Sequence, residues 1–189
     1  VADQANQPGV DAQHQRAEAV RARGVAEGLI EFMLTDLREK LDAVGRLDAL
    51  ASVSQRALQY YGGQELDVTD ADTLGRRART QMLIGEVDNL RGDLDAALRS
   101  YEQAAATTQE QLERDPDNPQ RLFDHSQSEF WVGYIAWQRG DLDRAERHMH
   151  AYHDYAQRLV ALEPDRAKWR LELGYAYSNL GTLTVERRN

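Results

Sequence analysis

The chain has 189 residues, enough for one compact domain or a short array of repeats, and it has no cysteine, which excludes disulfides and thiolate metal sites. Its formal net charge of −9 disfavours binding to nucleic acid or to an anionic membrane surface, because both require a basic patch. Because no apolar run approaches the ~18 residues of a membrane span, we expect no direct membrane insertion. The many Ala, Leu, Arg, Glu and Gln residues indicate an all-α protein.

The first elements expected along the chain are a leader and a helical hairpin. Residues 1–12 are polar and lack the apolar core of a signal peptide, so they predict a flexible leader. Residues 13–61 predict a hairpin, with a long helix from about Ala12 to Val44, and form a faint copy of a repeat found further along. Residues 62–71 are expected to be a connecting loop.

One stretch of sequence occurs twice. It begins RGDLD at Arg91 and returns 48 residues later at Arg139. The same offset places Gly85, Gly133 and Gly181 in register. A period of this length is typical of a solenoid built from stacked helical units.

Each unit is expected to contain two helices. In the first unit, a helix from about Asp72 to Leu90 ends at Gly92, which can adopt the positive φ found past a helix C-terminus. Asp93 then caps a second helix that runs to about Arg114 and stops before a proline. The repeats are assigned to residues 72–118, 119–166 and, in part, 167–189, with helices of the second unit at 119–138 and 142–162.

Both units carry small residues on each of their two expected helices. Gly85 and Gly133 lie on the first helix of each unit and Ala97 and Ala145 on the second, which predicts antiparallel helices that approach closely. Tyr101 stands one turn beyond Ala97 and is expected to wedge against the neighbouring unit.

This combination resembles the tetratricopeptide repeat family over residues 72–189, and more loosely over 17–61. The chain departs from the family at two aromatic positions of the unit, which hold Gln81 and Glu129 at the first and Asp88 and Ala136 at the second. The unit also exceeds the usual ~34 residues. The resemblance implies a tetratricopeptide-like helical-hairpin solenoid of about 2.5 long repeats, preceded by a long N-terminal helix and hairpin. The matching positions are Ile84, Gly85, Gly92, Asp93, Ala97, Tyr101, Ala104, Val132, Gly133, Gly140, Asp141, Ala145, Met149, Tyr152, Leu180 and Gly181.

A second resemblance concerns residues 27–61. They are similar to a segment that precedes such repeats in large bacterial multidomain signalling proteins, where an effector domain lies upstream. Arg188 and Asn189 fall in register with the Gly-Asp connector, so the third unit is expected to be cut short. Both observations imply a fragment of a larger protein.

Catalytic and metal-binding patterns are sparse. No serine lies in a Gly-x-Ser-x-Gly turn, and no glycine-rich loop is built to hold phosphate. His148, His150 and His153 share one helix, but their spacing does not place two of them at i, i+4, as metal-binding helices require. We therefore predict no enzymatic activity and no cofactor, while metal binding by these histidines stays open as the minor interpretation.

What remains is a binding surface. In the family that the chain resembles, the first helix of each unit lines a concave groove that holds a peptide. The resemblance implies partner-binding positions at Met82, Glu86, Asn89, Phe130, Tyr134, Trp137, Tyr175, Ser178 and Thr182. Three of these, Phe130, Tyr134 and Trp137, follow i, i+4, i+7 on one helix face. Val132 and Gly133 already supply that helix's packing face, so the rings are expected to be partly exposed, although such stripes also occur in cores.

Two functions are compatible with these features. The first is a protein-interaction module that binds a peptide or helix in an aromatic and acidic groove. A related subclass grips carboxylate tails with a cationic clamp, but the matching positions here carry no cation, so an apolar or basic ligand is expected. The second is a structural spacer or homo-oligomerisation element, in which the N-terminal helix and the open end pack on another copy. A cytoplasmic or a periplasmic location is compatible with either.

Overall fold

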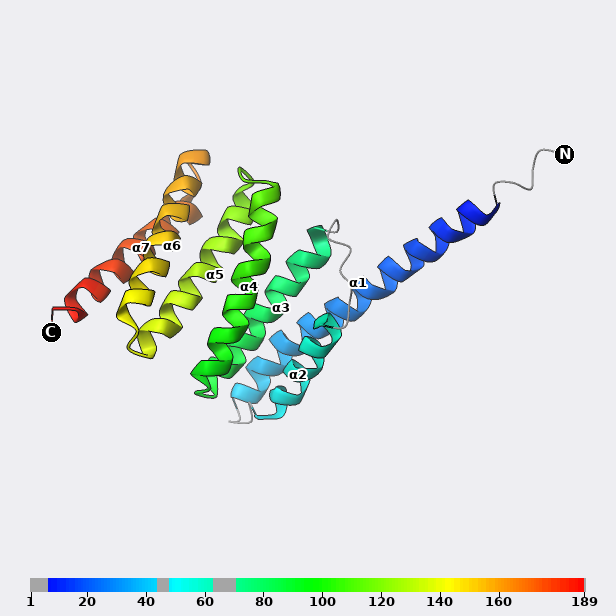
Figure 1. Ribbon diagram of the computed structural model, residues 1–189, viewed down its shortest axis with the longest axis horizontal. Coiled ribbons are helices and arrows are strands. Elements are labelled where there is room, and N and C mark those ends of the chain that lie inside the picture. The colour runs from blue at the N-terminus through cyan, green and yellow to red at the C-terminus, as the bar shows by residue number, and fades with distance from the viewer. Residues whose placement is uncertain (1–6, 44–47, 63–70, 189) are drawn as a thin grey trace.

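The structure is a computed structural model that describes residues 7–43, 48–62 and 71–188. Within these residues the chain forms seven α-helices and no β-strand, so the prediction of an all-α protein is confirmed (Figure 1). None of the described helices is long and apolar enough to cross a membrane. The helices are α1 (Gln7–Asp42), α2 (Asp48–Gly62), α3 (Ala71–Leu90), α4 (Leu94–Arg114), α5 (Pro119–Gln138), α6 (Leu142–Leu162) and α7 (Ala167–Glu186).

The helices stand in a row from α1 to α7, and the two chain ends lie at opposite ends of the row (Figure 1). From α3 onward each helix packs mainly on its neighbours in the chain, α3 on α4, α4 on α5, α5 on α6 and α6 on α7. The final part of α1 packs against α2 and α3, while its first half projects away from the other helices (Figure 1). The contacts are therefore almost all between elements close in sequence.

The two RGDLD stretches form the expected helix connectors. Gly92 and Gly140 have φ values of +80° and +78°, which side chains with a Cβ rarely adopt. Asp93 caps α4 by accepting a hydrogen bond from the backbone N–H of Ala96 at 3.0 Å, and Asp141 caps α6 in the same way. The repeated sequence thus encodes one local geometry twice.

Two of the three glycines in register mark close helix contacts. A Cβ on Gly85 would lie 2.8 Å from the buried ring of Tyr101, and one on Gly133 would lie 3.1 Å from the Cβ of His148. Tyr101 also reaches the next hairpin, as expected, because its ring stacks on Trp131 of α5 with centroids 5.3 Å apart. Gly181 differs, since no atom lies within 4 Å of its Cβ position.

Trp169 holds the start of α7 against the preceding helices. Its side chain is completely buried among Leu112, Leu122 and Leu159, which come from α4, α5 and α6. The indole Nε1 donates a hydrogen bond of 2.6 Å to the Glu163 carboxylate, so its one polar atom is satisfied.

The N-terminal boundaries differ from the prediction. Residues 7–12, expected to belong to a flexible leader, form the first turns of α1, and Pro8 fits there because the first turn has no hydrogen-bonded N–H to lose. The described part of the long helix reaches Asp42, and residues 44–47, which include its expected end at about Val44, lie outside the described residues. At the expected connecting loop, Gly62 and Ala71 are helical and residues 63–70 lie outside the described residues, as do residues 1–6.

Candidate functional site

Phe130, Tyr134 and Trp137 form a continuous row along one side of α5, and all three are half-buried. The rings of Phe130 and Tyr134 stack with centroids 5.9 Å apart, and Tyr134 meets Trp137 edge-on at 6.3 Å. The indole Nε1 of Trp137 donates a hydrogen bond to Glu186 of α7. We call these three residues the aromatic row.

The aromatic row contributes to the core as well as to the surface. Phe130 packs against the buried Tyr152 of α6, with ring centroids 5.4 Å apart, and against Ala176 of α7. Tyr134 packs on the core cluster around Tyr101. The rings therefore contribute to the core and are also partly exposed.

The predicted positions on α7 are more exposed. Tyr175 exposes 52% of its surface, and Ser178 and Thr182 are also exposed. The Thr182 hydroxyl donates to the backbone carbonyl of Ser178 at 3.0 Å, so it is partly committed to its own helix. Their helix meets the aromatic row at Ala176, in the core cluster on which Phe130 packs, and at Glu186.

A polar junction joins α5, α6 and α7. Glu172 of α7 accepts hydrogen bonds from the Gln127 amide at 2.9 Å and from the Tyr152 hydroxyl at 2.7 Å. Burial and the neighbouring Glu172 raise the pKa of Tyr152 far above its ordinary value, so its hydroxyl stays a donor.

The predicted positions on α3 lie on the other side of the aromatic row. Met82, Glu86 and Asn89 are half-buried. Met82 packs on the same core cluster as Tyr134, and its sulfur accepts a weak hydrogen bond from the Ser128 hydroxyl at 3.8 Å. Met82 therefore contacts the same core cluster as the aromatic row and also lines a neighbouring cavity.

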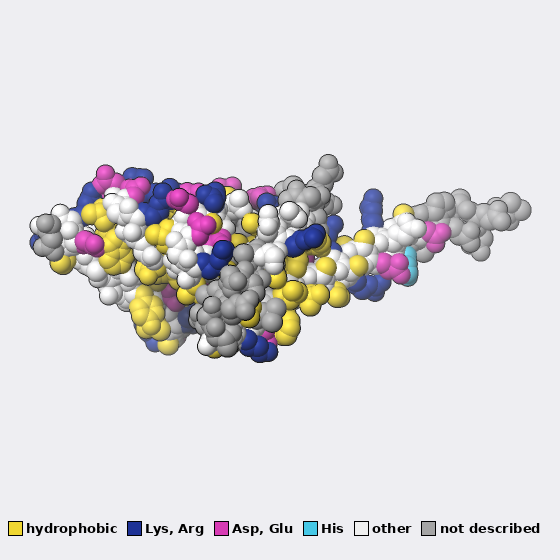
Figure 2. All heavy atoms as spheres, turned by 90° about the horizontal axis from the view of Figure 1, so that it is seen from below, with side chains coloured by type: hydrophobic (Ala, Val, Ile, Leu, Met, Phe, Trp, Pro, Cys, Tyr) yellow, Lys and Arg dark blue, Asp and Glu magenta, His cyan; other side chains and the backbone are white. Residues whose placement is uncertain are grey.

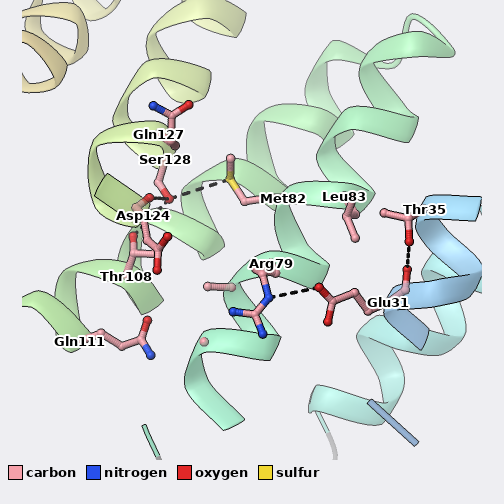
Figure 3. A pocket seen from close by; sticks show the side chains of 12 residues that line it. Glu31, Thr35, Arg79, Met82, Leu83, Thr108, Gln111, Asp124, Gln127 and Ser128 are labelled. Atoms are coloured by element: carbon pink, nitrogen blue, oxygen red, sulfur yellow. Dashed lines mark hydrogen bonds and ion pairs between the residues drawn. The ribbon is translucent and has the colours of Figure 1, made fainter. Parts of the chain in front are cut away.

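A cavity of about 260 Å³ opens between α1, α3, α4 and α5 (Figure 3). Apart from Met82, none of the predicted binding residues lines it. The lining residues are Glu31, Thr35, Gly75, Ala78, Arg79, Met82, Leu83, Thr108, Gln111, Asp124, Gln127 and Ser128.

The cavity has an apolar part and a charged margin. Met82 and Leu83 supply apolar surface, and Arg79 pairs with Glu31 across the α1–α3 boundary at 3.2 Å (Figure 3). Burial raises the pKa of the Asp124 carboxyl, although the Gln120 amide, which donates to it at 2.6 Å, opposes part of that shift. A side chain with an apolar stem and a polar or cationic end has the chemistry that this cavity could accept.

Most residues that line the cavity are not among the predicted binding positions. Arg79 and Gln127 lie about one turn before the predicted positions Met82 and Phe130, and Asp124 lies nearly two turns before Phe130. Extending each predicted stripe toward the N-terminus of its helix, by one turn on α3 and by two turns on α5, includes them. Glu31 and Thr35 carry no such signal, because α1 reaches the cavity only through tertiary packing.

The three histidines of α6 have separate environments. His148 pairs with Glu129 of α5 at 2.7 Å, His153 contacts Asp154 and the ring of Tyr177, and His150 is exposed. Among the described residues, no group of three or more histidine and carboxylate side chains is placed to hold a metal ion.

A buried polar network beside the cavity has a testable pH dependence. His125 bonds the Thr108 hydroxyl at 2.9 Å, and that hydroxyl also bonds Ser128 at 3.2 Å. Burial lowers the pKa of His125, with the Glu129 carboxylate opposing part of the shift. The unfolded chain therefore binds a proton more readily than the folded one as the pH falls below ~6.5.

We expect the free energy of unfolding to fall by about 1 kcal/mol between pH 7.5 and 5.5 through this one residue. The His125→Gln variant keeps a hydrogen-bonding side chain and should lose that part of the slope. Urea denaturation of both proteins at several pH values measures the difference. Parallel pH profiles for the two would show that His125 carries no such linkage.

No protein-family model matches the sequence, and no curated protein matches it either.

Proposed function

We propose that the chain is a protein-interaction module, built as a tetratricopeptide-like helical solenoid, that binds a peptide or helix across the aromatic row. The observation that carries the proposal is the row itself, three large rings on α5 that are packed on one side and accessible on the other. Rings held in this way suit binding, because little conformational entropy remains to be lost when a ligand covers them.

The neighbours of the aromatic row extend the proposed site in both directions. Toward α3, Met82 leads into the 260 Å³ cavity, which has room for one side chain of a ligand. Toward α7, Tyr175 offers a further exposed ring. A ligand that lies across α3, α5 and α7 would therefore meet a cavity, a row of rings and a single ring in succession.

The charges favour a ligand with basic residues. Glu86, Asp124 and Glu172 border the proposed site, and the whole chain carries a formal net charge of −9. A basic amphipathic peptide would place apolar residues on the rings and cationic ends near these carboxylates. We propose that this chemistry, rather than an acidic tail, defines the ligand class.

Site-specific photo-crosslinking tests where a ligand binds. Benzoylphenylalanine placed at Tyr175 should capture a radiolabelled basic amphipathic peptide, because Tyr175 is exposed beside the aromatic row. The same group at Leu162, which is 43% exposed at the end of α6, is the matched control. Equal capture at both positions would oppose the proposed site.

A second candidate function is self-association, alone or as a spacer in a larger bacterial signalling protein. It is favoured by the apolar side chains that α1 exposes, Val25, Leu29 and Phe32. The similarity of residues 27–61 to segments of multidomain signalling proteins supports the larger context.

A further inference from the structure

One face of α1 exposes large apolar side chains. Val25, Leu29 and Phe32 expose 74%, 57% and 56% of their surfaces, and their spacing of four and three residues places them on one side of the helix. Figure 2 shows hydrophobic side chains gathered along α1 near the point where it leaves the other helices. We call these three residues the α1 stripe.

The opposite face of α1 is already occupied. Glu27 and Leu34 are completely buried, Glu27 pairs with Arg76 of α3, and Ile30 packs on the core cluster formed with α2 and α3. Helices α2 and α3 therefore pack on the face of α1 that is opposite the α1 stripe. A second helix could approach the stripe without displacing α2 or α3.

Opposite charges stand at the two ends of the α1 stripe. Arg21 lies one turn before Val25, and Asp36 lies one turn after Phe32. Both are exposed, and neither forms an ion pair within the described part of the chain. An identical helix in the antiparallel direction would bring each arginine to the aspartate of the other copy, whereas a parallel one would place like charges together.

We propose that two copies of this chain pair their α1 helices antiparallel, about a two-fold axis between Gly28 and Leu29. In this arrangement Val25 of each copy meets Phe32 of the other, and Leu29 lies over Gly28, where no atom comes within 4 Å of the Cβ position. The surface is then self-complementary, as a two-fold interface requires. Arg21 and Asp36 form two ion pairs, one at each end.

The proposal refines the second candidate function and does not depend on the aromatic row. The α1 stripe spans only three large residues, so its area is below the ~800 Å² per partner of a standard stable interface. We therefore expect a reversible dimer whose population rises with protein concentration.

Disulfide trapping tests the direction of pairing, since the chain has no native cysteine. Arg21→Cys protein mixed with Asp36→Cys protein should form mixed disulfide dimers under mild oxidation, while either variant alone should form few. Cross-linking of each variant with itself at the rate of the mixture would overturn the antiparallel arrangement.

Sedimentation equilibrium tests the surface. Leu29→Asp should remove the dimer, whereas Val20→Asp should not, because Val20 is 54% exposed on the same helix but lies off the stripe. Arg21→Asp and Asp36→Arg should each weaken dimerisation by about threefold to tenfold, and the double variant should restore it. A wild-type chain that stays monomeric at every concentration, or equal effects of Leu29→Asp and Val20→Asp, would overturn the proposal.

Discussion

Replacing Gly85 by alanine is expected to lower the free energy of unfolding by about 1–3 kcal/mol. The added Cβ would lie 2.8 Å from the Tyr101 ring, and that ring cannot withdraw because it is fully buried and stacked on Trp131. Either α3 and α4 separate or the stack is broken. The loss outweighs the gain of up to ~1 kcal/mol that alanine brings in helix propensity. Urea denaturation followed by circular dichroism measures the change.

Gly181→Ala is the matched control, because this glycine has the same place in the repeat but nothing within 4 Å of its Cβ position. Here only helix propensity changes, so we expect unchanged stability or a gain of up to ~1 kcal/mol. A loss of the same size in both variants would show that the contact with Tyr101 is not what requires glycine at position 85.

Replacing Trp169 by alanine is expected to cost about 3–5 kcal/mol. The indole is completely buried where α4, α5, α6 and α7 meet, and its removal leaves a large void and deletes the hydrogen bond to Glu163. Since α7 is attached to the rest of the chain mainly through α6, the first consequence should be release of α7.

Amide hydrogen exchange locates this effect, because protection should fall first between residues 167 and 186. Tyr177→Ala on the same helix is the control, since Tyr177 is 57% exposed and should cost no more than ~1 kcal/mol. Uniform loss of protection along the chain, or equal costs for the two variants, would contradict the role given to Trp169.

The helices were predictable where their ends are encoded locally. Gly92 and Asp93 terminate one helix and start the next through their own backbone and side-chain geometry, so α3 and α4 were located to within a residue or two. The beginning of α1 was missed for the opposite reason. Residues 1–12 are polar and have no apolar core, which predicts a flexible leader, but a helix needs no apolar face to extend by a few turns, and residues 7–12 are helical.

The candidate site was only partly predictable. The positions of Phe130, Tyr134 and Trp137 on one side of α5 follow from helical spacing alone. The stack of Trp131 on Tyr101 does not, because it depends on how α4 meets α5. The place of Glu31 at the cavity was not predictable either. Glu31 lies on α1, 48 residues before its ion-pair partner Arg79, so only the tertiary packing brings the two together.

The measurement that tests the central claim most directly compares the affinity of one ligand for three proteins. The ligand is a peptide selected on the wild-type chain from a displayed library of basic amphipathic helices. The binding variant is Tyr134→Ala/Trp137→Ala, and the control is Leu90→Ala/Leu162→Ala, which alters two leucines that are 48% and 43% exposed and lie outside the aromatic row and the cavity. All three are to be matched for helicity by circular dichroism.

Two interface rings that anchor a ligand contribute at least ~2 kcal/mol, so the dissociation constant should rise about 30-fold or more in the binding variant. In the control it should stay within about threefold of the wild-type value. Failure of the library to yield a binder, or a binder that the loss of Tyr134 and Trp137 leaves unaffected, would contradict binding at the aromatic row.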